Sequence, residues 1–176
     1  EKLINYLAKH KHMTPFRHNF IQLRCKVPLF LARQLMKHQA GLTWNEESRR
    51  YVDDIPEFYT PKEWRGRPEG SIKQGSSGGV DNGGAIASWY SHNIATAKEN
   101  YTDLLDNGVA PEMARMILPQ SMMVNFIWSG NLLSFFHVFS LRSGEGAQEE
   151  AKEFATLLGE VIQPVFPISW AALTKQ

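Results

Sequence analysis

The segment from Ile21 to Val27 alternates strictly between apolar and polar side chains, and this pattern constrains the fold more than any other part of the sequence. The apolar set is Ile21, Leu23, Cys25 and Val27, and the polar set is Gln22, Arg24 and Lys26. A period of two is typical of an antiparallel strand that buries one face. The apolar run SMMVNFIW at 121–128 predicts a second, buried strand. We therefore expect an α+β fold with a central, mostly antiparallel sheet.

Helices are predicted to flank this sheet. Apolar residues recur at helical spacing over 1–11, 85–106, 131–140 and 147–162, and shorter helices are expected from Pro28 to near Gly41 and over 111–118. Gly41 and Gly108 would end two of them, because glycine readily adopts the left-handed conformation that closes a helix. We expect one domain over 1–176, without internal repeats.

Residues 53–84 interrupt the pattern with three prolines and the glycine-rich run EGSIKQGSSGGVDNGG. This composition predicts a long, flexible loop that serves as a linker or as a lid. The run lacks both G-x-G-x-x-G and G-x-x-x-x-G-K-[ST], so it predicts neither a Rossmann turn nor a P-loop.

Composition excludes several functions. The 176 residues carry 19 Lys and Arg against 18 Asp and Glu, a formal charge of +1, which disfavours a protein held on DNA mainly by phosphate neutralisation. A single cysteine excludes intrachain disulfides and cysteine-rich metal sites, so we expect no metal and a reducing compartment: the cytoplasm, or the host cytoplasm for a viral-type protein. The sequence predicts no membrane span or signal peptide. It begins inside a predicted helix without methionine, so we expect further residues upstream.

Residues 43–51 (TWNEESRRY) fit neither period and have little to bury, which is typical of a surface or a site. Other polar residues also stand out from their surroundings: His12, Thr14, Gln34, Lys37, His38, Arg115, Asn131, His137 and Arg142. Taken singly, each fits an ordinary structural role, such as a helix cap or a solvated helix face.

Arg115 and Arg142 each stand alone among apolar neighbours. A buried guanidinium needs an anionic or carbonyl partner, because an unpaired buried charge is very costly. Either both residues form internal salt bridges with Glu46 or Glu47, or they converge with Arg50 on an anionic ligand such as a phosphate, which forked guanidinium donors suit well.

Three simpler chemistries are disfavoured. The Cys25 thiol lies in an apolar row that gives it no reason to ionise. Ser48 has no base near it in the sequence pattern, which favours hydrogen bonding to a ligand over nucleophilic attack. His38 has no His or Cys partner at the spacing of metal ligands.

Four segments together resemble the flavin-dependent thymidylate synthases, which make dTMP from dUMP without a cysteine nucleophile. They are HMTPFRH (12–18), KVPLFLARQLMKHQ (26–39), NEESRRY (45–51) and ARMILP with NLLSFFHVFSLRSGEGAQ (within 114–148). The signature of that family is R-H-R followed by N-E-x-S-x-R-Y. Here the first part reads Lys37-His38-Gln39, the gap before Asn45 is one residue longer, and the second part is intact.

The resemblance implies a homotetramer whose sites form between subunits, with FAD, NADPH and methylenetetrahydrofolate as cofactors and co-substrate. It implies Arg142 as the catalytic residue that polarises the uracil. The dUMP site would comprise Gln34, Leu35, Met36, Lys37, Glu46, Glu47, Ser48, Arg49, Arg50, Arg115 and Arg142. The FAD site would comprise His12, Thr14, Lys37, His38, Gln39, Glu46, Asn131, Leu132, Leu133 and His137, with Leu133 in place of a common arginine.

Two other functions remain open. The altered residues Lys37 and Gln39 are also compatible with a nucleotide-binding homologue that has weak or lost flavin binding and little activity. A single-stranded nucleic-acid binder would use Trp44 and Tyr51 to stack on bases beside Arg49 and Arg50, although the near-neutral charge argues against nucleic acid as a partner.

Overall fold

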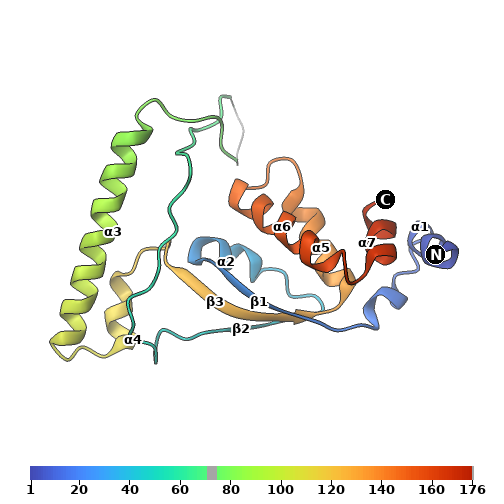
Figure 1. The fold of residues 1–176 in the computed structure, drawn as a ribbon, viewed down its shortest axis with the longest axis horizontal. Coiled ribbons are helices and arrows are strands. Elements are labelled where there is room, and N and C mark those ends of the chain that lie inside the picture. The colour runs from blue at the N-terminus through green and yellow to red at the C-terminus, as the bar shows by residue number, and fades with distance from the viewer. Residues whose placement is uncertain (71–74, 176) are drawn as a thin grey trace.

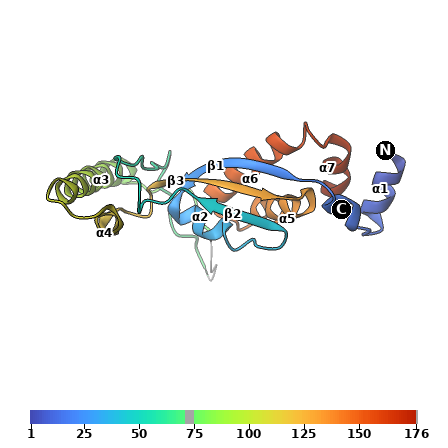
Figure 2. The ribbon, with the colours of Figure 1, turned by 90° about the horizontal axis from the view of Figure 1, so that it is seen from below.

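The centre of the molecule is a three-stranded antiparallel sheet (Figures 1 and 2). The computed structural model describes residues 1–70 and 75–175. The strands are β1 (Ile21–Pro28), β2 (Leu42–Glu46) and β3 (Met123–Gly130), in the order β1-β3-β2. The predicted antiparallel sheet is confirmed, and the long strand predicted at 121–128 lies in its middle.

The register places the alternating residues on one buried face. Cys25 pairs with Phe126 and Val27 with Val124, while Trp44 on β2 pairs with Trp128. On β3 every second side chain, from Val124 to Trp128, is buried. The opposite face carries the polar row of β1, which is exposed, so the predicted one-sided burial is confirmed.

Helices cover the buried face and both ends of the sheet. They are α1 (Lys2–Lys9), α2 (Leu29–Leu35), α3 (Gly83–Asp106), α4 (Pro111–Ala114), α5 (Leu132–Ser143), α6 (Glu149–Ile162) and α7 (Pro167–Thr174), with 3-10 turns η1 (Thr14–Arg17) and η2 (Arg115–Ile117). Figure 1 shows α5 and α6 above the sheet, α1 and α7 at one end, and α3 and α4 at the other. None of the helices in the described part of the chain combines the length and the apolar character needed to cross a bilayer.

Aromatic rings join the helices to the sheet. Trp128 on β3 is almost fully buried and meets Phe135 of α5 edge to face, with ring centroids 5.5 Å apart. Trp44 of β2 stacks on Phe126 at 3.4 Å. Buried aromatic side chains contribute a large apolar area each, and such pairs add about 1 kcal/mol beyond it, so this cluster fixes the position of α5 on the sheet.

Three sequence predictions need correction. The helix that starts after Pro28 ends at Leu35 rather than near Gly41, although Gly41 has the predicted left-handed conformation, with φ 72°. Segment 43–51 is not wholly irregular, since its first four residues belong to β2; the alternation of Leu42, Trp44 and Glu46 was too short and too polar to indicate it. Helix α7, rich in alanine and without an amphipathic pattern, was not predicted at all.

The segment between β2 and α3 contains no helix or strand in its described residues. It makes isolated bridges to the rest of the chain and to itself, Phe58 with Met122 and Arg65 with Gly79. The prediction of a flexible loop over 53–84 includes residues 71–74, which lie outside the described residues, and its flexibility stays a prediction.

Gly41 offers a test of the turn that leads into β2. A Cβ at this position would collide with Ser134 Oγ and lie 2.9 Å from Asn131 Nδ2, at a φ that L-residues rarely adopt. We expect Gly41→Ala to lower the free energy of unfolding by about 2–3 kcal/mol, from backbone strain and displacement of the α5 cap. Gly108→Ala is the matched control, because its φ is 81° and nothing lies within 4 Å of its Cβ position. Equal losses in urea unfolding would contradict the steric part of this account.

Candidate active site

Arg142 lies in the last turn of α5 and is held by neutral acceptors. Its Nε donates to His38 Nε2 at 3.0 Å, and its Nη2 donates to the backbone oxygen of Gln34 at 3.2 Å. No carboxylate pairs with it within residues 1–70 and 75–175. The structural alternative of a salt bridge to Glu46 or Glu47 is therefore wrong for Arg142, and its charge is left for a ligand.

Two pKa values support this geometry. Burial lowers the pKa of His38, and the positive charge of Arg142 and the neighbouring His137 lower it further. His38 is therefore neutral at neutral pH, as it must be for Nε2 to accept a hydrogen bond. Burial also lowers the pKa of Arg142, although guanidinium groups stay charged in proteins.

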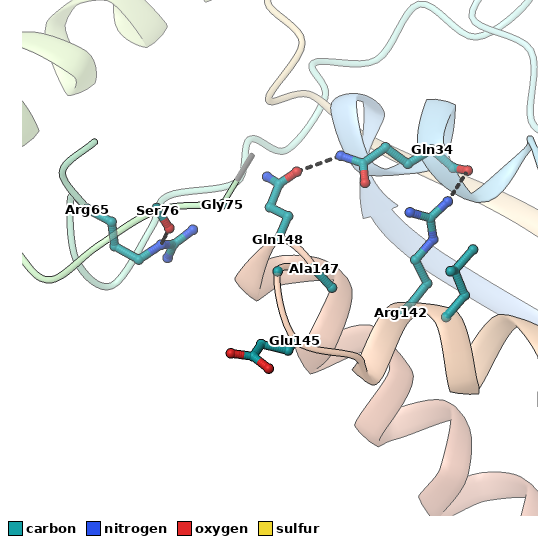
Figure 3. Close-up of a pocket in the computed structure, with 10 residues that line it drawn as sticks. Gln34, Arg65, Gly75, Ser76, Arg142, Glu145, Ala147 and Gln148 are labelled. Atoms are coloured by element: carbon teal, nitrogen blue, oxygen red, sulfur yellow. Dashed lines mark hydrogen bonds between the residues drawn. The ribbon is translucent and has the colours of Figure 1, made fainter. Parts of the chain in front are cut away.

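A pocket of about 600 Å³ opens in front of Arg142 (Figure 3). Gln34 and Gln148 line it beside Arg142, and the 53–84 segment contributes Arg65 and Ser76. The two amides are joined, with Gln34 Nε2 donating to Gln148 Oε1 at 2.5 Å. The pocket thus combines two guanidinium groups, those of Arg142 and Arg65, and the carboxylate of Glu145 with several neutral hydrogen-bonding groups. The two cations suit a polar ligand with negative or carbonyl oxygens.

The other predicted phosphate ligands form a second cluster. Glu46, Ser48 and Arg115 line a separate pocket of about 390 Å³. Arg50 Nε lies 3.5 Å from Glu112 Oε2, and Arg115 Nε donates to the backbone oxygen of Glu112 at 3.2 Å. Both guanidinium groups are exposed, so the expectation that Arg115 is buried is wrong. Within one chain, Arg50 and Arg115 come together and Arg142 does not join them.

Glu46 lies on the buried face of the sheet, opposite Phe126. Burial raises its pKa, and the charge of Arg115 opposes that rise. The half-buried carboxyl of Glu46, Arg115 and the Ser48 hydroxyl form a small polar patch at the end of β2. This arrangement can bind a phosphate and a sugar hydroxyl together.

The remaining residues of the predicted dUMP site have varied positions. Leu35 is fully buried, so its side chain belongs to the core, whereas Met36 and Lys37 are exposed. Arg49 is mostly buried and bonds Asp54 and the hydroxyl of Tyr101, 3.2 Å away. Its guanidinium therefore anchors the start of the 53–84 segment to α3. Glu47 accepts a hydrogen bond from Asn125 at 2.9 Å.

Segment 36–41 runs along α5 and connects several residues of the predicted FAD site. His38 contacts Arg142 near the end of α5, and Gly41 approaches Asn131 at its start. Gln39 and His137 are exposed on this surface, and His12 and Thr14 are exposed beside η1. Asn131 caps α5 by accepting from Ser134 N at 3.0 Å. Leu132 and Leu133 are core residues, so only their backbone atoms could contact a ligand.

Comparison with known proteins identifies the family. A family model described as thymidylate synthase complementing protein matches residues 1–168. A flavin-dependent thymidylate synthase of Thermus thermophilus is 36% identical over 173 residues, 98% of this chain and 63% of that protein. Another, of Kosmotoga olearia, is 33% identical over 98% of this chain and 75% of that protein. The chain belongs to the flavin-dependent thymidylate synthase family. The chain spans less than two thirds of the length of the Thermus relative.

Solved structures agree with this membership. The UMP/dUMP methylase PolB of Streptomyces cacaoi, bound with 5-Br UMP, aligns with a TM-score of 0.90 at 30% identity, covering 99% of this chain and 81% of that one. The form bound with 5-Br dUMP aligns with a TM-score of 0.87 at 28% identity, covering 99% and 78%. The thymidylate synthase fold expected from the sequence motifs is therefore confirmed, while the tetramer stays a prediction.

Sequence reasoning missed Arg65 and Gln148, which line the pocket of this thymidylate synthase family member, and Glu150, which accepts hydrogen bonds from both. Glu150 carried a usable signal, since it lies four residues before Phe154 and eight before Leu158 on the buried face of α6. A carboxylate in such a row needs a partner. Arg65 carried no signal, because it lies in an irregular segment.

The buried thiol of Cys25 provides a test of the nucleophile-free chemistry. Burial raises the pKa of Cys25 to about 11, so almost no thiolate exists at neutral pH. We expect Cys25→Ala to cost about 1–2 kcal/mol of stability through the lost packing volume and to leave turnover within about twofold of wild type. The native protein should resist iodoacetamide at pH 8 and react only when unfolded. A turnover loss far beyond the stability loss would restore Cys25 as a reactive group.

Proposed function

We propose that this protein is a flavin-dependent thymidylate synthase that converts dUMP to dTMP, with methylenetetrahydrofolate as the carbon donor and NADPH as the reductant of FAD. One observation carries the proposal. The half-buried guanidinium of Arg142 has no carboxylate partner in the described chain, and it lines a polar pocket. Solved relatives at 28–30% identity hold halogenated dUMP and UMP, which supports a pyrimidine nucleotide as its ligand.

In this proposal, different residues of the chain bind the phosphate and the uracil of the nucleotide. Ser48, Arg50 and Arg115 would bind the phosphate, because Arg115 lines one pocket with the Ser48 hydroxyl and both guanidinium groups approach Glu112. Arg142 would bind a carbonyl oxygen of the uracil and stabilise negative charge that develops on the ring. His38 and the Gln34 backbone keep that guanidinium in place.

The surface along segment 36–41 fits a flavin dinucleotide. A dinucleotide carries a diphosphate, and this surface exposes Lys37, Gln39 and His137 as cationic or hydrogen-bonding groups. Lys37, His38, Gln39 and His137 would hold the cofactor, with His12 and Thr14 at its far end. When bound, FAD supplies the hydride that completes the methyl group.

A complete site would require a second copy of the chain. Arg142 and Arg115 line separate pockets of one protomer, yet in this proposal one nucleotide contacts both. The exposed surface near the second cluster supports assembly: Met113 of α4 and Met116 of η2 are 54% and 73% exposed, and among the described residues of α3 only Tyr101 is buried. An apolar surface of this kind is typical of an interface, and a homotetramer with shared sites accounts for it.

One alternative keeps a specific observation in its favour. Leu133, in place of the arginine common in the family, lies in the core and supplies no cation, so flavin binding could be weaker than in relatives. A colourless purified protein that FAD does not reconstitute would support a nucleotide-binding homologue. Two of the four residues that a nucleic-acid binder would use are already engaged within the chain, because Trp44 is stacked on Phe126 and Arg49 is bound to Asp54.

Arg142→Ala tests the catalytic assignment. We expect turnover to fall by about 10²- to 10³-fold, the usual loss when a donor to a developing negative charge is removed, while folding and the yellow flavin colour persist. Formation of dTMP measured with labelled dUMP gives the rate. Arg33→Ala, an exposed arginine of the neighbouring helix α2, is the matched control. Undiminished turnover in Arg142→Ala would overturn the assignment.

His38 predicts the direction of the pH dependence. Because its folded pKa is below the ordinary 6.5, the imidazole gains a proton only as pH falls below that value. Protonation removes the acceptor at Nε2 and places a positive charge beside Arg142. We expect dUMP affinity to fall on acidification from pH 7.5 to 5, and to fall less in His38→Gln, which keeps an acceptor that does not titrate. His18→Gln, a change at an exposed histidine, should behave as wild type. If dUMP affinity falls equally on acidification in wild type, His38→Gln and His18→Gln, this role of His38 is excluded.

A further inference from the structure

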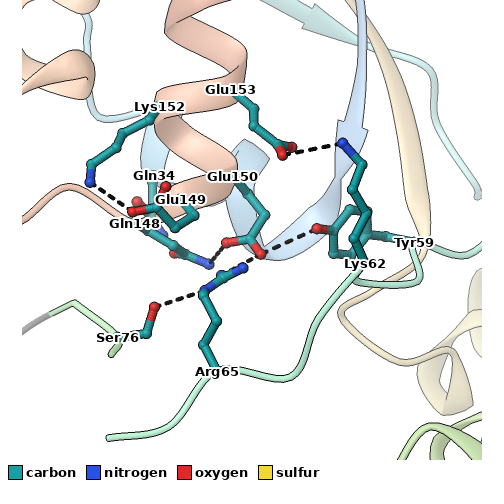
Figure 4. A network of polar contacts seen from close by, with 10 residues as sticks. All are labelled: Gln34, Tyr59, Lys62, Arg65, Ser76, Gln148, Glu149, Glu150, Lys152 and Glu153. Carbon is teal, nitrogen blue, oxygen red and sulfur yellow. Dashed lines mark hydrogen bonds and ion pairs between the residues drawn. The ribbon is translucent and has the colours of Figure 1, made fainter. Parts of the chain in front are cut away.

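Glu150 is a buried carboxylate that the proposed chemistry does not use. It lies in the first turn of α6 with 7% of its surface exposed. Its Oε1 accepts from Arg65 Nη2 at 2.6 Å and from the Tyr59 hydroxyl at 3.2 Å, and its Oε2 accepts from Gln148 Nε2 at 2.8 Å (Figure 4). Burial alone would raise the pKa of Glu150, but the hydrogen bonds from Arg65, its own backbone and Gln148 outweigh burial and lower it. Glu150 is therefore ionised at neutral pH.

An ionised carboxylate can only accept hydrogen bonds, and this fixes the amide of Gln148. Its NH₂ group must face Glu150, so its oxygen must face Gln34. Gln34 then has to present Nε2 to that oxygen, at 2.5 Å. The orientation of both amides follows from the charge of Glu150, which Arg65 stabilises.

The last amide in this series faces the nucleotide pocket. Gln34 Oε1 accepts no hydrogen bond from the part of the chain that the structure describes, and Figure 3 shows no dashed line to it. Nη1 of Arg142 likewise makes no hydrogen bond to the described residues. Gln34 and Arg142 both line the pocket, which therefore offers an acceptor from Gln34 Oε1 and a donor from Arg142 Nη1.

This pair matches one edge of uracil. The imide edge of uracil carries an N3–H donor between two carbonyl acceptors, so N3–H can donate to Gln34 while a carbonyl accepts from Arg142. In the same pose, cytosine would place its unprotonated N3 opposite the Gln34 oxygen, so two acceptors would face each other. Cytosine meets the pair only if the base shifts, so that its 4-amino group donates to Gln34 and its N3 accepts from Arg142, and the proposed phosphate contacts oppose that shift. We propose that Arg65, Glu150 and Gln148 are positioning residues that hold the carbonyl oxygen of Gln34 toward the pocket, so that the site selects uracil over cytosine. This inference rests on the proposed function.

The same logic predicts what a single change does. In Glu150→Gln, Arg65 can only donate, so it holds the oxygen of the new amide and leaves its NH₂ group facing Gln148. Gln148 must then turn its oxygen toward position 150 and its NH₂ group toward Gln34. Gln34 in turn accepts from Gln148 and presents NH₂ to the pocket, which matches the N3 acceptor of cytosine.

The test measures the dissociation constants of dUMP and dCMP for the purified, flavin-loaded oligomer by titration calorimetry. We expect wild type to prefer dUMP. In Glu150→Gln, the dissociation constant of dCMP divided by that of dUMP should fall by at least about tenfold, and dCMP should bind as well as in wild type or better. Glu149→Gln is the matched control, because Glu149 lies one residue away and pairs with Lys152 at 2.7 Å. It should leave the ratio unchanged.

A rescue variant separates positioning from a general structural defect. The double variant Glu150→Gln with Gln148→Glu moves the carboxylate from position 150 to position 148. There it accepts hydrogen bonds from the new amide at position 150 and from Gln34, so Gln34 again turns its oxygen toward the pocket. The dUMP preference should recover. If Glu150→Gln fails to fold, Gln148→Met tests the same ratio. It removes the hydrogen bonds that Gln148 makes with Gln34 and Glu150 and keeps the ion pair between Arg65 and Glu150.

The outcomes distinguish this inference from the proposed function. A wild-type protein that binds neither nucleotide would overturn both. Wild-type binding of dUMP and dCMP with equal affinity, or a Glu150→Gln variant that weakens both nucleotides by the same factor, would overturn the inference and leave the proposed function standing.

Discussion

The position of α5 on the central strand is the constraint on which the site depends. Trp128 and Phe135 meet edge to face in the core, and this contact sets both the height and the rotation of the helix. Arg142 lies two turns beyond Phe135 on the same helix, so packing in the core determines where the guanidinium lies. Its neutral acceptors, His38 and the Gln34 oxygen, then fix its direction without cancelling its charge.

The ion pairs of the chain leave Arg142 without a carboxylate and place Arg50 and Arg115 elsewhere. This arrangement explains why the candidate site is divided between two places. The chain pairs its buried carboxylate, Glu150, with Arg65 rather than with Arg142. Arg50 and Arg115 share the exposed Glu112 near α4, at the far end of the sheet from α1 and α7. Under the proposed function, one protomer would hold two incomplete anion sites. A nucleotide that bridges copies of the chain would satisfy both, which links substrate binding to assembly.

Much of the fold follows from local patterns in the sequence. The alternation from Ile21 and the apolar run before Gly130 are long enough to specify β1 and β3, and helices α3, α5 and α6 follow from their spacing. Strand β2 is only five residues long and ends in a charged residue, so its pairing with β3 decides its conformation. Candidate site residues could be named from the sequence where a motif surrounds them, as for Arg142, and their roles stay predictions. Arg65 was not, because its role depends on a contact with a residue 85 positions away.

The departures from the family signature acquire a physical meaning in this arrangement. Lys37 and Gln39 are both exposed, whereas His38 between them is half-buried and accepts the hydrogen bond from Arg142. A residue that positions another group tolerates little change in shape or protonation, while a residue on a solvated ligand surface needs only charge or hydrogen-bonding capacity. Lysine keeps the charge of arginine, and glutamine keeps its donors. Under the proposed function, the substitutions fall where the cofactor would be contacted and leave intact the histidine that accepts the hydrogen bond from Arg142.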